Sequence, residues 1–210
     1  MISSRCEADR TVKYMPGKKQ HKTLHVKNMV CPRCIRVVRE ELEKLGISVN
    51  EITLGEVNVY YDPEVISQEK INETLEANGF ELLIDKKART IEHIKSYIIN
   101  LIHYGDPGKY EQQNFSSLLE KELNMDYHYL SSLFSSVENI TIEQFIILQK
   151  IEKAKELVKY DEMTLSEIAY KLGYKSVQHL SNQFKKTTGM TASQFKKMAS
   201  NMRKPLDSVN

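Results

Sequence analysis

The chain has 210 residues, of which 40% are hydrophobic and 28% charged, enough for two modest domains with their own cores. It has no apolar run long enough to cross a membrane, and its polar, basic start lacks the apolar stretch of a signal peptide. Three cysteines do not make a disulfide framework. We therefore expect a cytoplasmic protein with no membrane partner. The formal net charge of +2 neither indicates nor excludes a nucleic-acid partner, so the distribution of charge must decide.

Residues 1–22 show no periodicity and contain a Pro-Gly-Lys-Lys stretch, which predicts a mobile N-terminal arm in which Cys6 has no role. Residues 23–86 are predicted to form the first domain. Leu24 and Val26 alternate as in a strand, a loop follows, and apolar residues at helical spacing then run from Ile35 to Leu45.

The rest of this domain reads as a hairpin, a helix and a strand. Residues 47–54 and 57–61 predict two strands joined by a turn at Gly55-Glu56. Ser67 begins a helix that ends at Asn78-Gly79, and Phe80, Leu82 and Ile84 alternate as a last strand. The predicted order is βαββαβ, the ferredoxin-like arrangement, so the fold class of the chain is α+β.

The loop after the first strand contains Cys31 and Cys34 in a C-x-x-C motif. Two thiolates at the start of a helix can close on one soft ion, because the helix N-terminus favours their ionised form. Two sulfurs suit Cu(I) or Ag(I), whereas Zn(II) normally takes four ligands. Cu(I) is the expected metal, with Ag(I), Hg(II) and Zn(II) as other candidates.

Residues 23–85 resemble the heavy-metal-associated domain of copper chaperones and of copper-pump N-termini, through the M-x-C-x-x-C motif at residues 29–34 in the βαββαβ order. The resemblance implies that Cys31 and Cys34 are the metal ligands. It also implies that Met29 packs under the loop and that Phe80 is an aromatic residue near the site. Asn28 stands where the family usually has Gly.

Three other interpretations of the cysteine pair remain open. A thiol-disulfide exchange enzyme would need a longer order of strands and helices. A structural zinc site would borrow His21 or His25, and a domain of this family can also keep its cysteines without binding metal. No other nucleophile and base pair, phosphate loop or carboxylate dyad stands out, so we do not expect an enzyme.

Residues 87–200 are predicted to form the second domain, and residues 201–210 a mobile tail. Lys86, Lys87 and Arg89 mark a short joint between the domains. A helix from Thr90 to His103 follows, and the Gly-Asp-Pro-Gly stretch at residues 105–108 breaks it.

The second domain contains one motif twice, displaced by fifty positions. Phe134, Thr141 and Phe145 of the first copy correspond in this way to Phe184, Thr191 and Phe195 of the second. Each copy predicts two short helices joined by a tight turn, as in a helix-turn-helix motif, although an ordinary helical bundle remains an alternative.

The turns and caps are clearest in the second copy. Thr164 and Glu167 form a capping box, Gly173 ends the first helix, and Ser176 and Gly189 bound the second. The expected inward residues are Ile168, Ala169, Leu172, Val177, Leu180, Ser181 and Phe184.

A long helix from Thr141 to Lys159 connects the copies, with Phe145, Leu148, Ile151, Ala154, Leu157 and Val158 as its apolar residues. At ~1.5 Å per residue it spans roughly 28 Å, about the distance between successive major grooves on one DNA face.

Residues 91–199 resemble the DNA-binding region of AraC/XylS-type transcription regulators, which has two such modules and a connecting helix. The match is carried by SEIAYKLGYKS at residues 166–176, FKKTTGMT at 184–191 and KIEKAKEL at 150–157. The family often has Gly where Asn139 stands and Arg where Lys150 stands, so the first copy is the more divergent.

The outward positions predicted to contact DNA differ between the copies. In the second copy they are Lys175, Ser176, Gln178, His179, Asn182, Gln183, Lys185 and Lys186. In the first copy they are His128, Tyr129, Ser132, Leu133 and Ser136, with Tyr127 beside them. Residues 114–139 carry four acidic residues and one basic residue, whereas residues 161–204 carry eight basic and three acidic ones.

Together these features predict a metal-responsive, sequence-specific DNA-binding regulator whose partners are double-stranded DNA, through the major groove, and a soft metal ion. The alternative is a metallochaperone or metal-trafficking adaptor whose helical domain docks a protein partner.

Overall fold

The computed structural model describes residues 19–105 and 114–201. The predictions for Cys6, for residues 1–18 of the arm, for the breaker residues 106–108 and for residues 202–210 of the tail lie outside these ranges. The first strand already begins at Gln20, so residues 20–22 belong to the sheet and the predicted arm is too long. Residue 201, assigned to the tail, belongs to the last helix.

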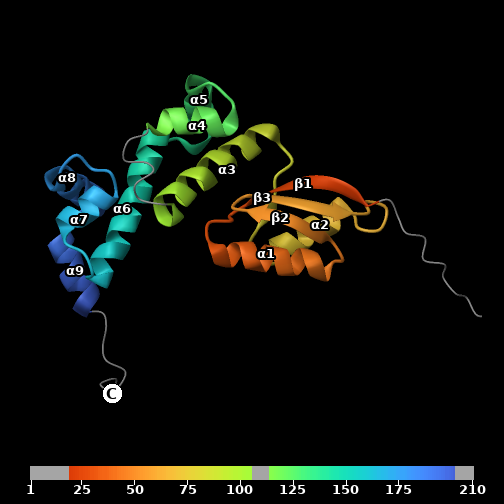
Figure 1. Ribbon diagram of the computed structural model, residues 1–210, viewed down its shortest axis with the longest axis horizontal. Helices are drawn as coiled ribbons and strands as arrows, with labels where there is room; N and C mark the ends of the chain where they lie inside the picture. The colour runs from red at the N-terminus through yellow and green to blue at the C-terminus, as the bar shows by residue number, and fades with distance from the viewer. Residues whose placement is uncertain (1–18, 106–113, 202–210) are drawn as a thin grey trace, which may run out of the picture.

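The N-terminal half is a four-stranded antiparallel sheet with two helices on one face (Figure 1). Its elements are β1 (Gln20–Lys27), α1 (Pro32–Lys44), β2 (Ser48–Thr53), β3 (Glu56–Tyr61), α2 (Gln68–Glu76) and β4 (Glu81–Leu82). The strands lie in the order β2-β3-β1-β4, and β1 pairs with both β3 and β4. The predicted βαββαβ sequence of elements is therefore present.

Local sequence signals explain the ends of these elements. Pro32 occupies the first turn of α1, where its missing N–H costs nothing, and Cys31 is the N-cap. The Ser67 side chain accepts a hydrogen bond from the backbone N–H of Lys70 at the start of α2. Gly55 in the β2–β3 turn has a φ of 87°, a conformation that favours glycine.

The last strand is shorter than predicted. β4 ends at Leu82, and the last backbone bond to β1 runs from the N–H of Leu83 to the carbonyl of His25, at 2.8 Å. Phe80 and Leu82 are buried as expected, but Ile84 lies beyond the pairing and its side chain is 74% exposed. The alternating pattern is therefore wrong at Ile84.

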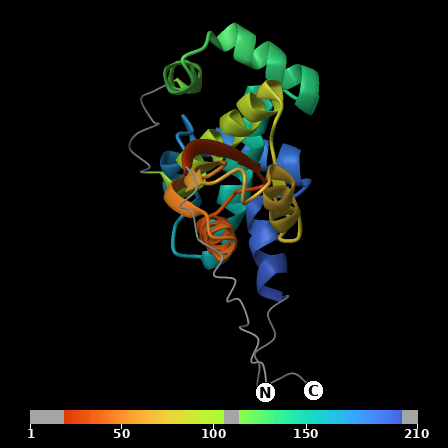
Figure 2. The ribbon, with the colours of Figure 1, turned by 90° about the vertical axis from the view of Figure 1, so that its right-hand side faces the viewer.

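The C-terminal half is helical. It comprises α3 (Lys86–Ile99), the π-helical turn η1 (Asn100–Tyr104), α4 (Phe115–Leu123), α5 (Tyr127–Glu138), α6 (Ile142–Tyr160), α7 (Leu165–Lys171), α8 (Val177–Thr188) and α9 (Ala192–Asn201). We call α4 and α5 the first module and α7 and α8 the second module. The two modules lie toward opposite ends of α6 (Figures 1 and 2).

The helix predicted from Thr90 to His103 begins four residues earlier than expected. Asp85 caps it, because its side chain accepts hydrogen bonds from the backbone N–H groups of Lys87 and Ala88 at 3.1 and 3.2 Å. Lys86, Lys87 and Arg89 therefore lie within α3 and do not form a separate joint.

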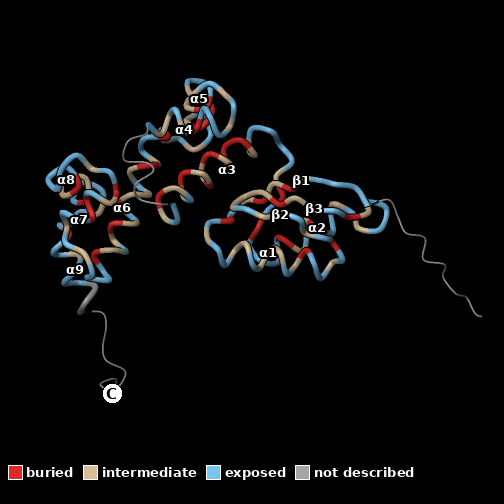
Figure 3. Tube along the Cα trace, in the orientation of Figure 1, coloured by how far each residue is buried: buried red, intermediate tan, exposed pale blue. Residues whose placement is uncertain are grey.

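Buried side chains form three clusters, visible as separate buried regions in Figure 3. The first lies between the sheet and α1–α2 and includes Met29 and Phe80. The second contains α3, η1 and the first module, and the third contains the second module and α9. The first half of α6 contributes Ile142 and Ile146 to the second cluster, and its second half contributes residues to the third. A single helix thus contributes buried residues to the clusters of both modules.

Two residues expected to face inward do not. Leu148 of α6 is 41% exposed, because the helix changes its buried side between the two clusters. Val177 is 38% exposed at the first turn of α8, whereas Leu180 and Phe184 are fully buried as predicted. In the described ranges, no helix combines the length and the apolar character needed to cross a bilayer.

Candidate metal centre and nucleic-acid interface

The cysteine loop (residues 28–34) connects β1 to α1. Cys31 Sγ lies 3.2 Å from Cys34 Sγ, and both thiols are partly exposed. The backbone N–H of Cys34 donates to the carbonyl of Cys31 at 2.9 Å, which folds the loop into the first turn of α1. The motif spacing and the helix start therefore bring the two sulfurs together.

The surroundings favour an ionised Cys31. The hydrogen bond from the Cys34 side chain lowers the pKa of the Cys31 thiol most strongly, and the backbone N–H groups of Cys34 and Arg33 contribute further. A thiolate is the form that binds a soft metal.

The donor set consists of two sulfurs. Within the described residues, no third His, Cys, Asp or Glu joins the pair to make a group that could hold a metal. His21 instead packs its ring on Tyr60, and His25 lies against Glu56, Arg89 and His93. The pair fits a two-coordinate soft cation better than a four-coordinate zinc ion.

Met29 and Phe80 lie in the hydrophobic cluster beneath the cysteine loop, between the sheet and α1–α2. Met29 is fully buried and Phe80 is 8% exposed, both in the cluster against which Cys34 packs. Asn28 has a φ of 71°, so it adopts the left-handed conformation that glycine would supply. Its side chain donates to the carbonyl of Gly79 at 3.1 Å, which ties the loop to the segment before Phe80.

The second module has the geometry expected of a helix-turn-helix. The Thr164 and Glu167 capping box starts α7, Gly173 takes a positive φ in the turn, and the Ser176 hydroxyl accepts from the N–H of His179 at 3.2 Å. Tyr174 packs its ring edge-on against His179 at 5.4 Å, and burial raises the pKa of Tyr174 to about 12.

The outward face of α8 carries most of the predicted DNA contacts. The exposed residues are Lys175, Ser176, Gln178, His179, Asn182, Lys185 and Lys186. Gln178 donates to the Asn182 side chain at 2.9 Å, which places two amide groups side by side. Gln183 differs from expectation, because it is only partly exposed and its Oε1 atom is buried.

The first module has the same arrangement of helices and caps as the second, but different exposed residues. Asp126 caps α5 by accepting from the N–H of Tyr129 at 3.1 Å, and Asn139 ends the helix with a φ of 57°. The predicted contact residues His128, Tyr129, Ser132 and Ser136 are exposed. Leu133 was expected to point outward but is buried at 8% exposure in the core of the module.

Tyr127 does not lie free on this face either. Its hydroxyl donates to the Glu143 carboxylate on α6, and its ring packs against the second cluster. This contact lowers the pKa of Glu143, and burial followed by the same hydrogen bond raises the pKa of Tyr127. Tyr127 therefore connects α5 of the first module to α6.

One lysine holds the two modules against each other. The Lys150 Nζ atom on α6 lies 5.5 Å from the centre of the Phe115 ring and 5.3 Å from that of Tyr174. Phe115 begins the first module, and Tyr174 lies in the turn of the second. This contact of Lys150 could not be predicted from the sequence, because its two aromatic partners lie far away along the chain.

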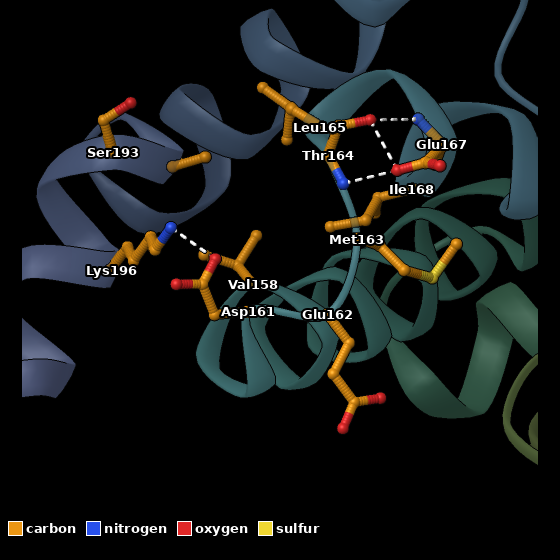
Figure 4. Close-up of a pocket in the computed structure, with 11 residues that line it drawn as sticks. Val158, Asp161, Glu162, Met163, Thr164, Leu165, Glu167, Ile168, Ser193 and Lys196 are labelled. Carbon is orange, nitrogen blue, oxygen red and sulfur yellow. Dashed lines mark hydrogen bonds and ion pairs between the residues drawn. The ribbon is translucent and has the colours of Figure 1, made fainter.

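Figure 4 shows a pocket of about 390 Å³ where α6, α7 and α9 meet. The ion pair between Lys196 and Asp161 lies on one side, and the Thr164–Glu167 capping box lies on the other. Four of its polar residues, Thr164, Glu167, Asp161 and Lys196, bond to one another across or beside the pocket. The pocket lies at the junction of α6, α7 and α9.

A protein-family model described as a helix-turn-helix domain matches residues 119–198, which span most of both modules and α9. Residues 119–198 are therefore similar to this helix-turn-helix family. The cysteine loop and the sheet lie outside the matched residues.

Curated relatives match a longer stretch at lower identity. The uncharacterized HTH-type transcriptional regulator YtdP of Bacillus subtilis is 27% identical over 176 residues, 81% of this chain and 22% of its own length. The melibiose operon regulatory protein of Escherichia coli K12 is 22% identical over 132 residues, 60% of this chain and 43% of its own length. The chain thus spans less than half of the length of either relative.

Solved structures with similar helices include the C-terminal domain of AraT from Geobacillus stearothermophilus, 21% identical with a TM-score of 0.45 over 60% of this chain and 95% of that one. The DNA-binding domain of AdpA in complex with a target DNA is 17% identical, with a TM-score of 0.43 over 57% of this chain and 96% of that one.

Proposed function

We infer that this chain is a cytoplasmic transcription regulator that binds specific double-stranded DNA through its helix-turn-helix domain and responds to a soft metal, Cu(I), held by Cys31 and Cys34. The observation that carries the inference is the joint presence of an exposed basic and amide-rich face on α8 and a pair of thiols 3.2 Å apart.

On the DNA side, α8 serves as the recognition helix in the major groove. The amide groups of Gln178 and Asn182 have the donor and acceptor pattern that reads base edges, particularly adenine. Lys185 and Lys186 in its last turns neutralise phosphates. The first module contributes fewer phosphate contacts, because its corresponding positions are Ser135 and Ser136.

On the metal side, we assign the N-terminal half as a ferredoxin-like, heavy-metal-associated domain. The βαββαβ order and the antiparallel order β2-β3-β1-β4 support this assignment. So does the position of the cysteine pair at the start of α1. Asn28, in the left-handed conformation, supplies the turn that brings Cys31 to the helix N-terminus.

The residues of the loop determine the ionisation and the position of the two sulfurs that would bind the cation. The lowered pKa of Cys31 favours its thiolate, the form that binds a soft cation. Buried Met29 fixes the base of the loop, so the two sulfurs stay on the exposed side of the cluster. A bound cation contributes positive charge between two thiolates. It changes DNA affinity only if it binds more tightly to one of two conformations that differ in their affinity for DNA.

The DNA-binding test is fluorescence anisotropy of labelled DNA from upstream of this gene, titrated with reduced protein that is metal-free or Cu(I)-loaded. A scrambled duplex at the same salt concentration is the control. We expect preference for the upstream duplex and a shift with Cu(I). Equal binding to both duplexes by both forms of the protein would contradict the assignment.

The metal test uses the Cys31→Ser/Cys34→Ser double variant. It should lose the Cu(I)-dependent shift and keep the metal-free affinity for DNA, because the cysteines lie in the other half of the chain. A variant with an unchanged metal response would eliminate the cysteine pair as the sensor.

One observation favours a second function, a metal-trafficking adaptor that docks a protein. The first module exposes Tyr129 and Val137 among acidic residues, a surface better suited to a protein than to DNA. This function predicts tight Cu(I) binding together with no preference for any duplex in the anisotropy titration.

A further inference from the structure

The cysteine loop is bonded on both sides of Met29 to one continuous helix of the other domain. The backbone N–H of Asn28 donates to Glu92 Oε1 on α3 at 3.1 Å. The Tyr104 hydroxyl at the end of η1 donates to the carbonyl of Val30 at 3.3 Å. Val30 immediately precedes Cys31, so the metal ligand is one residue away from a contact with the helical domain.

A third contact lies between these two domains. A Cβ placed on Gly55, in the β2–β3 turn, would come within 2.8 Å of Ser96 Oγ on α3. Val26, at the end of β1, donates its N–H to the carbonyl of the same Gly55 at 2.9 Å. The sheet and α3 therefore meet through backbone and polar groups, while their apolar clusters remain separate.

The Glu92 contact continues to the first module. Glu92 is 7% exposed, and Lys95 Nζ lies 3.6 Å from its carboxylate. Lys95 Nζ also lies 3.4 Å from Glu138 Oε1, at the last residue of α5. Since Glu92 accepts the loop N–H and pairs with Lys95, displacement of Asn28 changes the partners of a buried carboxylate that is linked to α5.

The Tyr104 contact continues to α6 and to the second module. The neighbouring His103 places Nε2 3.0 Å from Gln149 Oε1 on α6. The end of η1 also lines a cavity of about 150 Å³ together with Lys153 of α6 and with Lys171 and Leu172 of the second module. Movement of η1 would thus change the contacts of α6 and of the second module around this cavity.

The form of η1 makes such movement feasible. Residues 100–104 are π-helical and directly follow α-helical residues 86–99. A π-helical turn is an uncommon, wider turn that often occurs at functional positions, and a return to α-helical winding would rotate the last residue about the helix axis. Tyr104 is that last residue, and its side chain is 48% exposed.

We propose that α3–η1 transmits occupancy of the Cys31–Cys34 pair to the helix-turn-helix domain, with Tyr104 and Glu92 as positioning residues and η1 as the segment that changes. This inference rests on the proposed metal-responsive function and names how that response travels. It follows from the two hydrogen bonds that join the loop to this helix and from the contacts that join the helix to α5 and α6.

The test is hydrogen–deuterium exchange of the full chain, with and without Cu(I) under reducing, oxygen-free conditions. The variants are Tyr104→Phe, Cys31→Ser/Cys34→Ser and the control Tyr160→Phe, which alters an exposed tyrosine at the end of α6. Cu(I) affinity is measured in parallel by competition with a chelator, so that loss of binding is distinguished from loss of transmission.

In the wild type and in Tyr160→Phe, Cu(I) should change exchange in residues 28–45 and also in residues 96–105 and 145–153. In Tyr104→Phe the change in residues 96–105 and 145–153 should be lost, with Cu(I) affinity altered less than about threefold, because the hydroxyl contacts a carbonyl and not a sulfur. The double cysteine variant should show no change anywhere.

Two results would overturn the proposal while leaving the metal site intact. One is a wild-type change confined to residues 28–45, and the other is a Tyr104→Phe variant that keeps the full change. If the wild type shows neither Cu(I) binding nor any change in residues 28–45, the proposed metal function fails and this inference fails with it.

Discussion

The two helix-turn-helix modules have the same frame and different surfaces. Leu130 and Leu180 are fully buried, as are Phe134 and Phe184, and each pair is separated by fifty positions. The exposed positions differ, because Lys185 and Lys186 correspond to Ser135 and Ser136. The two copies therefore agree at buried positions and differ at the exposed positions predicted to contact DNA.

The first module has also acquired bonds that the second lacks. Tyr127 and Glu143 hydrogen-bond in the first module, and the residues fifty positions later are Val177 and Ser193. The first module shares its core with α3, whose opposite contacts reach the cysteine loop. Under the proposed function, the first module is the side that receives the metal signal and the second is the principal DNA-binding module.

The largest effects should come from the buried phenylalanines. Phe134→Ala and Phe184→Ala should each cost about 3–5 kcal/mol, because each removes a fully buried ring from its own cluster. Hydrogen exchange should show α4–α5 loosened by the first variant and α7–α8 by the second. Only Phe184→Ala should abolish DNA binding. Equal loosening of both modules in both variants would show that the two clusters are one cooperative unit.

A charge exchange tests the difference between the surfaces. Lys185→Ser/Lys186→Ser should reduce the slope of log affinity against log salt by about 1.8, from ~0.9 for each lost phosphate contact. Ser135→Lys/Ser136→Lys should increase that slope if the first module lies against DNA, and Ser135→Ala/Ser136→Ala is its matched control. An unchanged slope in the Lys185→Ser/Lys186→Ser variant would remove α8 from the interface.

The Tyr127–Glu143 contact of the first module should make stability depend on acid. The hydrogen bond from Tyr127 lowers the pKa of Glu143, so its contribution to stability is present above the unfolded carboxyl value of about 4.3 and is lost as pH falls through the lower folded pKa. Tyr127→Phe should cost about 1 kcal/mol at neutral pH and reduce this acid dependence. Urea unfolding at neutral pH and below pH 4 measures both. A Tyr127→Phe variant with the wild-type pH profile would contradict this role of Glu143.

The smallest effect concerns the joint between the modules. Lys150→Met keeps the unbranched, apolar stem and removes the charged Nζ atom from between the Phe115 and Tyr174 rings. Thermal unfolding should show a loss of about 0.5–2 kcal/mol, the usual range for a cation over aromatic rings. Lys159→Met, on the same helix and exposed, is the control. Equal losses in both variants would mean that the two rings contribute nothing.

Local signals predicted most of the fold. The Thr164–Glu167 capping box, Ser176 and Gly189 each act within a few residues, so the sequence alone predicts them. Leu133 was misassigned because its partner fifty positions later is Gln183, and a polar residue at that position suggested an outward face for both.

The contacts between the domains could not be predicted in this way. Glu92 is a charged residue buried on α3. Its carboxylate accepts a hydrogen bond from the backbone N–H of Asn28, which lies 64 positions earlier in the chain. Tyr104 reaches a carbonyl 74 positions earlier. Neither hydrophobic periodicity nor a sequence motif indicates either contact, because each contact depends on how the two halves of the chain pack against each other.

The most direct test of the account is the Cu(I) affinity of the full chain, measured by chelator competition with and without a saturating amount of its own upstream duplex. Binding free energies are reciprocal, so DNA must change Cu(I) affinity by the same factor by which Cu(I) changes DNA affinity. We predict a change of at least about fivefold, the lower end of typical allosteric coupling. Equal Cu(I) affinity with and without DNA would show that the cysteine pair and α8 act independently, and the regulator would not be metal-responsive.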